Sequence, residues 1–396
     1  MISFEPTEEQ QLIVENVAAF ARQRLRPAVR ATERARALAP ELVAEAVALG
    51  LPGMDLPADA GGAGLGLLDA ALVDEALAWG DAAAPFALPG AHAYGAVVRE
   101  LAPPERHAEL LAPFAQGEAL GAFAWTEPGA HPEALATTAR RDLDGWVLDG
   151  VKSHCLHAGR ATHLAVAAQV DGTRGWDGVG VFLVPVGAPG LTRLGRAGTV
   201  GLDGACFGGL RLEGVRVPAG ARLGDDEGTA RGLARAFLRV ALRAGARAVG
   251  LARAAAEVAL AYTQERHAFG KPVAHFQAVA FTLADRHLEV DAAGLLVRRA
   301  AALWDRGAVD PGACAVAAAT ALRCALRASD DAVQLHGGAG FMRDYLPEKL
   351  LRDARTLSLY GMSAAVLDQV VAAEELGLPF DAASRLPTPD VQSVFT

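Results

Sequence analysis

The residues with the clearest chemical potential lie at positions 262–277, where the chain reads YTQERHAFGKPVAHFQ. Arg266 stands at the end of a long alanine-rich helical pattern, and a Phe-Gly-Lys-Pro turn separates it from a second helical pattern. An arginine can donate two parallel hydrogen bonds to a pyrophosphate and is always charged. An arginine beside Glu265, before a Gly-Lys-Pro turn, is also typical of a plain surface. The residues alone therefore leave both interpretations open.

Other candidate chemistry is weaker. His154 and His157 lie on either side of Cys155, between two predicted strands, and this spacing offers too few ligands for a metal, so no metal site is predicted. The glycine-rich residues 61–66 lack a following Lys-Ser/Thr and a preceding strand, which favours a connecting loop over a phosphate cradle. The cysteines form no C-x-x-C pair and are expected to be reduced and buried. They are Cys155, Cys206, Cys314 and Cys324.

Length and composition narrow the class of protein. With 396 residues and 52% hydrophobic content, the chain can bury a large core and is expected to form two or three domains. A net charge of -9 argues against a nucleic-acid partner. Arginines interrupt each apolar stretch before it could span a bilayer, and residues 1–10 contain neither a basic nor an apolar targeting region. We expect a cytoplasmic protein without membrane insertion.

The elements that must position these residues change in character twice. Residues 1–118 are predicted to be helical, starting at a capping box formed by Thr7 and Gln10 and continuing through helices at 68–79 and 94–114. Residues 119–227 contain short apolar runs separated by turn residues, which predicts a small β domain. The predicted strands are 145–148, 164–168, 179–184 and 210–217.

Residues 228–378 are helical again and are followed by a tail at 379–396 that is rich in Pro, Ser and Asp. Short connections between long helices predict a four-helix bundle. The expected helices are 228–266, 275–306, 311–334 and 347–376. The predicted fold is therefore mainly α, with an N-terminal helical domain, a central β-barrel or sandwich domain and a C-terminal bundle.

This order of domains resembles the acyl-CoA dehydrogenase family over nearly the whole chain. The resemblance is carried by ERHAFGKP at 265–272 with Gln277 downstream, and by QLHGGAGF at 334–341. Two further motifs agree with it, TEPGA at 126–130 in the β domain and LLRDAR at 350–355.

The resemblance implies an FAD cofactor shared between two subunits of a homodimer or homotetramer. Arg266 and Gln277 would hold the pyrophosphate and adenosine of a neighbour's FAD, together with the turn at Gln334, Gly337 and Gly338. In the same subunit as the flavin ring, Thr126 would address that ring, with Phe123 and Trp125 nearby. Further cofactor contacts are implied at His154, Leu156, Phe269 and Ser363.

The implied chemistry is α,β-dehydrogenation of an acyl-CoA or acyl-carrier thioester, with an electron-transferring flavoprotein or another acceptor taking the electrons. A carboxylate usually removes the α-proton, but its position is occupied by Gly361, and the alternative position on the preceding long helix reads Val240-Ala241. The position whose hydroxyl bonds the flavin N5 is Leu156, and the position of a serine that contacts pantetheine is Pro132. The resemblance therefore supports flavin binding more firmly than dehydrogenation.

Three hypotheses follow from this departure. The protein is an active dehydrogenase with a relocated base, for which Asp203, Glu133 and His154 are candidates because they lie near the flavin motifs in sequence. Alternatively, it is a catalytically silent subunit of a mixed tetramer with a base-bearing homologue. The third hypothesis is a relative that uses flavin for oxygen chemistry or another oxidation in a biosynthetic pathway, where no α-proton base is required.

Overall fold

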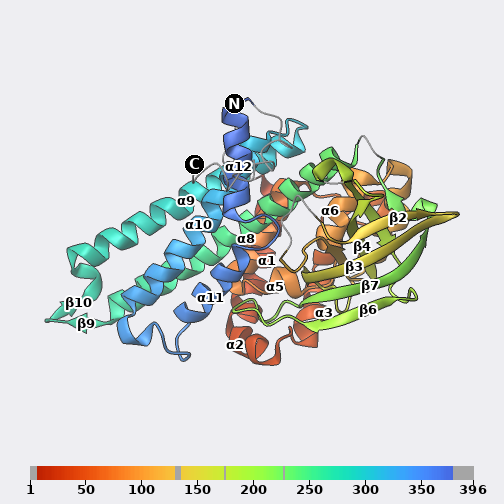
Figure 1. Ribbon diagram of the computed structural model, residues 1–396. Helices are drawn as coiled ribbons and strands as arrows, with labels where there is room; N and C mark the ends of the chain where they lie inside the picture. Colours follow the sequence, from red (N-terminus) through yellow and green to blue (C-terminus); the bar gives the residue numbers. More distant parts are fainter. Residues whose placement is uncertain (1–6, 130–134, 174, 226–227, 378–396) are drawn as a thin grey trace, which may run out of the picture.

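The computed structural model describes residues 7–129, 135–173, 175–225 and 228–377. It contains a helical N-terminal region, a twisted sheet and a set of long C-terminal helices, in the predicted order (Figure 1). Within the described residues, no helix is long and apolar enough to cross a membrane. The predicted fold class is confirmed.

The N-terminal region begins with helix α1 (Glu8–Phe20), which the predicted capping box starts. The Gln10 backbone amide donates to the Thr7 hydroxyl over 3.2 Å, and the Thr7 amide donates to the Gln10 side chain over 3.0 Å. The predicted helix at 94–114 is wrong, because Pro103 and Pro104 follow the end of α6 and remove backbone donors. The other helices are α2 (Arg26–Ala35), α3 (Pro40–Ala48), α4 (Leu67–Gly80), α5 (Ala84–Ala87), α6 (His92–Leu101) and α7 (His107–Leu111).

The central region forms an eight-stranded sheet in the order β6-β7-β3-β2-β4-β5-β8, with β1 parallel to β4. All four predicted strands are present, as β3 (Gly145–Leu156), β4 (His163–Val170), β5 (Val179–Val184) and β7 (Phe207–Pro218). Sequence patterns did not predict the shorter or exposed strands β1 (Gly121–Ala124), β2 (Thr138–Asp142), β6 (Leu191–Arg196) and β8 (Arg222–Leu223). These strands lack a long apolar alternation, which is the signal that sequence patterns carry.

Strand β3 is irregular where it approaches the helices. Its pairing with β7 shifts register between Lys152 and Cys155, and His154 has a φ of 54° within that shift. A bulge of this kind turns a strand and redirects its side chains. The irregularity thereby brings His154 and Leu156 to the end of the sheet that faces the helical regions.

The C-terminal region is built around α8 (Thr229–Glu265), which packs against α4, α6, α9 and α10. Small residues allow this close packing: a Cβ added at Gly250 would lie 2.1 Å from the Glu75 carbonyl oxygen. The remaining helices are α9 (Gln277–Asp305), α10 (Pro311–Leu335), α11 (Pro347–Leu357) and α12 (Ala364–Glu375). At the far end from the sheet, β9 (His267–Ala268) and β10 (Lys271–Pro272) form a small hairpin between α8 and α9 (Figure 1).

The single helix predicted at 347–376 is wrong, because residues 358–363 interrupt it between α11 and α12. Gly361 has a φ of 72°, which a helix cannot contain, and Ser363 caps the new helix by accepting from the Val366 amide. This interruption carries Tyr360 and Gly361 out of the bundle and towards the sheet.

A buried lysine connects α11 to the N-terminal region. The Lys349 ammonium lies 2.5 Å from the Asp353 carboxylate and 3.1 Å from that of Asp81, and all three side chains are buried. Asp353 also accepts from the Leu202 amide over 2.6 Å, which brings the β domain into the same network. The network ties together all three regions that surround the interruption after α11.

Candidate active site

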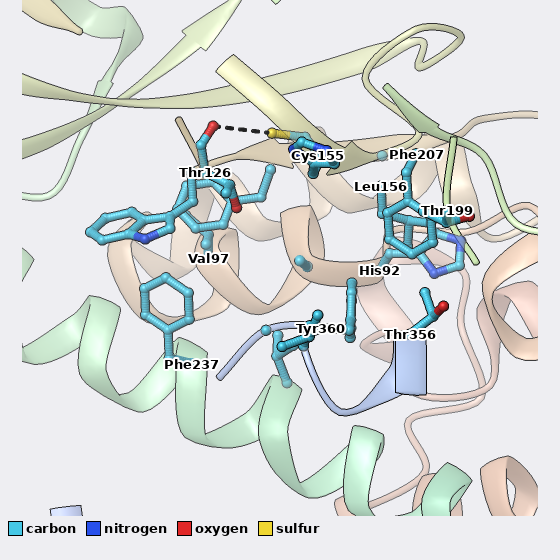
Figure 2. Close-up of a pocket in the computed structure, with 18 of the residues that line it drawn as sticks. His92, Val97, Thr126, Cys155, Leu156, Thr199, Phe207, Phe237, Thr356 and Tyr360 are labelled. Carbon is cyan, nitrogen blue, oxygen red and sulfur yellow. Dashed lines mark hydrogen bonds between the residues drawn. The ribbon is translucent and has the colours of Figure 1, made fainter. Parts of the chain in front are cut away.

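A cavity of about 290 Å³ lies where the three regions meet. Its walls come from β1, β3, α6 and α8, and from the interruption after α11 (Figure 2). In this view, Thr126, Val97 and Phe237 lie towards one end, whereas Thr199, Thr356 and His92 lie towards the other. The lining is mostly apolar, as is usual for a pocket that binds a flat organic group.

One wall contains the residues that the β-domain motif predicted for the flavin ring. Phe123, Trp125 and Thr126, at and beyond the end of β1, line the cavity, as do His154 and Leu156 on β3. The structure thus brings together five residues that the sequence places in two separate motifs.

A buried ion pair positions the turn that carries Thr126. The Lys152 ammonium lies 2.6 Å from the Glu127 carboxylate and donates to the Trp125 carbonyl oxygen over 3.1 Å. Glu127 also accepts from the Thr137 amide over 3.0 Å. Because both charged groups are buried and hydrogen-bonded, the turn is held in one conformation.

Cys155 lies between the two predicted flavin contacts of β3 and also lines the cavity (Figure 2). Its Sγ is 3.3 Å from the Ser153 carbonyl oxygen and 3.9 Å from that of Thr126. Burial raises the pKa of the Cys155 thiol to about 11, so it stays protonated at neutral pH and is a poor nucleophile. Leu156 beside it has no hydrogen-bond donor to offer a flavin.

The opposite wall contains Tyr360, Gly361 and Val240, which include both positions where the family resemblance locates a carboxylate base. The two positions meet in space, because a Cβ added at Gly361 would lie 2.9 Å from the Val240 Cγ1. Among the described residues that line the cavity, there is no aspartate or glutamate. The described lining therefore offers no carboxylate as a base.

The three base candidates that were predicted from their sequence positions have different locations in the structure. Asp203 does not line the cavity, because its carboxylate lies 3.6 Å from the Arg36 guanidinium and 3.7 Å from that of Arg352, in a network outside it. Glu133 lies outside the described residues. His154 lines the cavity, and its side chain is exposed.

A second histidine, His92, lines the cavity from the start of α6 and was not singled out by any motif. Its Nε2 lies 2.9 Å from the Leu88 carbonyl oxygen, and since a carbonyl only accepts, Nε2 carries the proton and Nδ1 keeps a lone pair. Its φ of 47° is uncommon for a residue with a side chain, and such conformations cluster at functional sites.

The surroundings of His92 keep its ring neutral. Burial and the positive charge of Arg247 lower the pKa of His92 to about 4. The ring centre of His157 lies 4.8 Å away, and burial and the neighbouring His92 hold the pKa of His157 well below its usual value. A neutral imidazole with a pKa near 4 is about as basic as an ordinary glutamate, whose pKa is about 4.3. The cavity thus contains a neutral imidazole, although its described lining has no carboxylate.

The predicted clamp residues lie elsewhere. Arg266, Gln277, Gln334, Gly337 and Gly338 are exposed towards the hairpin end of the long helices, and none of them lines the cavity (Figure 1). Among the described residues, the Arg266 guanidinium has no ion-pair partner, which leaves it available for a ligand.

Two further predicted cofactor contacts can be placed. The Phe269 side chain, at the hairpin tip, is 97% exposed, which is unusual for a phenylalanine in a protein without a partner. Ser363 does not line the cavity and instead caps α12.

The chain matches three family models, described as the N-terminal domain of acyl-CoA dehydrogenase at residues 7–118, its middle domain at 122–215 and its C-terminal domain at 227–376. The chain belongs to the acyl-CoA dehydrogenase family. A probable acyl-CoA dehydrogenase, YngJ, of Bacillus subtilis is 32% identical over 95% of this chain and 100% of its own.

Solved structures agree with this membership. Butyryl-CoA dehydrogenase from Megasphaera elsdenii has a TM-score of 0.88 at 28% identity, covering 95% of this chain and 100% of its own. A glutaryl-CoA dehydrogenase from Mycobacterium smegmatis, solved in complex with FADH2, has a TM-score of 0.85 at 28% identity, covering 94% of this chain and 95% of its own. Members of this family are FAD-dependent oxidoreductases, so FAD is the cofactor of this acyl-CoA dehydrogenase family member.

The residues of the cavity fit a flavin ring. Phe123, Trp125 and Phe207 supply an aromatic and apolar lining, and the exposed Thr126 hydroxyl can bond to a polar ring edge. The fit is incomplete at Leu156, which cannot supply the hydroxyl expected there. The lining of this acyl-CoA dehydrogenase family member thus fits a flat ring, without a hydroxyl at position 156.

Proposed function

We propose that the protein catalyses α,β-dehydrogenation of an acyl thioester, with FAD as oxidant and His92 as the base. The observation that carries the proposal is that a neutral imidazole lines the same cavity as Gly361 and Val240, the two positions where the usual carboxylates are absent. The substrate is an acyl-CoA or acyl-carrier thioester, and an electron-transferring flavoprotein or another acceptor reoxidises the protein.

The residues divide the work between orientation and proton transfer. Bound FAD supplies the acceptor for the hydride that leaves the β-carbon. Thr126 and Trp125 orient the ring from one wall, and the apolar wall at Val240 and Phe237 excludes water from the acyl group. His92 accepts the α-proton at Nδ1, while its Nε2–H bond to the Leu88 carbonyl oxygen fixes the tautomer. The absence of a glutamate therefore does not remove proton chemistry.

The test is anaerobic mixing of the FAD-loaded protein with a panel of acyl-CoA thioesters. Loss of the visible flavin absorbance together with formation of the enoyl thioester supports the proposal. If no thioester reduces the flavin, the silent-subunit hypothesis is favoured when the protein copurifies with a homologue from its native host. Rapid oxygen consumption by the reduced flavin with another substrate favours the biosynthetic oxidation instead.

The position of the clamp favours cofactor sharing within an oligomer. The cavity lies at one end of the subunit, and the residues that would hold the FAD pyrophosphate lie at the other, beside the hairpin (Figure 1). One subunit therefore does not offer a single FAD both sets of contacts. A second copy that places Arg266 near this cavity would complete the site.

Replacing Arg266 by Ala is expected to weaken FAD binding by at least about tenfold, because a charge-assisted hydrogen bond contributes about 1.5–3 kcal/mol. The measurement is the FAD content after gel filtration, followed by titration of the apoprotein with FAD. Arg306→Ala, an exposed position at the other end of α9, serves as the control. Equal FAD affinity in Arg266→Ala and the parent protein would contradict the clamp.

The pH dependence of flavin reduction follows from the lowered pKa of His92. Protonation removes the base, so the rate should be constant above about pH 5 and fall as the pH is lowered, with a midpoint near 4. Stopped-flow reduction from about pH 3 to 8 measures this profile, and circular dichroism at each pH checks that the fold persists. A midpoint near 6.5, the ordinary value for a histidine, would contradict the assignment of His92.

A further inference from the structure

A second, smaller cavity of about 30 Å³ adjoins the first, and has room for one water molecule or one carboxylate group. The two cavities share His92, Ala93, Val240 and Tyr360 in their linings. An acyl chain that extends along these shared residues in the main cavity would therefore end next to the smaller one.

The smaller cavity has a strongly basic lining. Arg239, Arg243 and Arg247 recur every fourth residue along α8 and so lie on one face of that helix, while Arg99 approaches from α6. Like charges spaced in this way repel one another on a helix. The arrangement requires negative charge nearby.

The protein supplies only part of that charge. Arg243 lies 2.6 Å from the Asp74 carboxylate and 3.1 Å from that of Asp55, and Arg247 lies 3.1 Å from Asp74. Arg99 donates to the backbone carbonyl oxygen of Asp55. Two carboxylates thus face four guanidinium groups.

Arg239 is the guanidinium with the weakest pairing. It lies over the Trp304 ring at 5.1 Å, and its buried Nε has no hydrogen-bond partner among the described residues. The next carboxylate, Glu100, is engaged by Arg235 over 2.7 Å. Arg239 is half-buried, and a guanidinium that is partly removed from water without an anionic partner is costly, so a bound carboxylate would offset that cost.

We propose that the smaller cavity binds an anionic terminus of the acyl chain, so that the preferred substrate is a thioester whose far end carries a carboxylate. The terminus would lie next to Arg239 and Arg243, with the thioester in the main cavity. This inference rests on the proposed function for the placement of the thioester, and on the arginine cluster for the chemistry of the terminus.

The test compares pairs of CoA thioesters of equal chain length, one ending in a methyl group and one in a carboxylate, over a series of lengths. At the best length, the carboxylate is expected to tighten binding by about ten- to one-hundredfold, the gain typical of hydrogen bonds to charged groups. Binding is measured by calorimetry on the FAD-loaded protein, and flavin reduction is measured separately. Equal affinity for both members of every pair would overturn the inference.

Two variants isolate the role of the cavity. Arg239→Gln should remove most of the preference for the carboxylate. Arg235→Gln should keep it, because Arg235 also lies over Trp304 at 5.1 Å but does not line the cavity. If the preference for the carboxylate-ended thioester is unchanged in Arg239→Gln, or is lost equally in both variants, the arginine cluster does not bind the carboxylate.

The two proposals can fail separately. A carboxylate-ended thioester that binds tightly without reducing the flavin supports the basic cavity and contradicts the dehydrogenase assignment. If the flavin is reduced but both members of each pair bind with equal affinity, the dehydrogenase assignment is supported and the role of the basic cavity is contradicted.

Discussion

Replacing His92 by Asn is expected to slow flavin reduction by acyl thioesters by about 10²- to 10⁴-fold, the usual contribution of a general base, while FAD remains bound. Asparagine tolerates the φ of 47° at this position, although its shorter side chain loses the bond that Nε2 makes to the Leu88 carbonyl oxygen. It cannot accept a proton at neutral pH. The measurement is the limiting rate of anaerobic reduction together with the FAD content.

His107→Asn provides the matched control. Its ring nitrogen lies 3.0 Å from the Ala102 carbonyl oxygen, as His92 bonds to Leu88, but His107 does not line the cavity. The control should reduce at the parental rate. Full activity in His92→Asn would show that His92 is not the base, and His154 would then be the remaining histidine in the cavity lining.

A carboxylate placed at position 240 should restore part of the rate in the His92→Asn background. Val240 lies on α8 with an ordinary helical backbone and lines the cavity, so Val240→Glu introduces a base without backbone strain. Gly361→Glu is the poorer choice, because its φ of 72° disfavours a side chain and its Cβ would lie 2.9 Å from Val240. No rescue at position 240 would mean that the α-carbon does not lie near this wall.

Lys349→Met should destabilise the protein by about 3–5 kcal/mol, the usual result of removing one partner from a buried ion pair. Asp81 and Asp353 would then remain buried without a cation, and burial already raises the pKa of Asp353. Urea unfolding followed by circular dichroism measures the free energy of unfolding.

Two comparisons test whether the destabilisation of Lys349→Met comes from the buried ion pairs. Arg24→Met removes an exposed pair with Glu45 and should cost less than about 1 kcal/mol. Adding Asp81→Asn and Asp353→Asn to Lys349→Met should recover part of the loss, because no unpaired charge is then buried. A loss below about 1 kcal/mol in Lys349→Met alone would contradict the structural role of the network.

Local patterns predicted the long helices well and their interruptions poorly. Helix α8 has a continuous periodic pattern, whereas the interruption after α11 depends on one glycine with positive φ and one capping serine, both common on helix surfaces. The strands β1 and β6 escaped prediction because one is short and the other largely exposed. In each case the deciding contacts come from distant parts of the chain.

In the candidate site too, residues within a local motif were predicted, whereas residues brought together by the fold were not. Thr126, Phe123 and Trp125 were predicted as flavin contacts because they lie in or directly before one family motif, and all three line the cavity. His92 could not be found in this way, since nothing beside it in sequence indicates that it lines the same cavity as Val240 and Tyr360. The sequence also does not show that Gly361 and Val240, the two positions of the missing carboxylates, are neighbours in space. In the structure, a Cβ added at Gly361 would lie 2.9 Å from the Val240 Cγ1.

The length of α8 has a consequence for how the assembly can change during evolution. Val240 near its start borders one proposed flavin site, and Arg266 caps its end, roughly 40 Å away at about 1.5 Å per residue. Under the proposed sharing, this rigid rod fixes the spacing between two cofactors. One inserted residue would turn Arg266 by about 100° relative to Val240. Length changes should therefore accumulate in surface loops, while the segment between these two residues keeps its length.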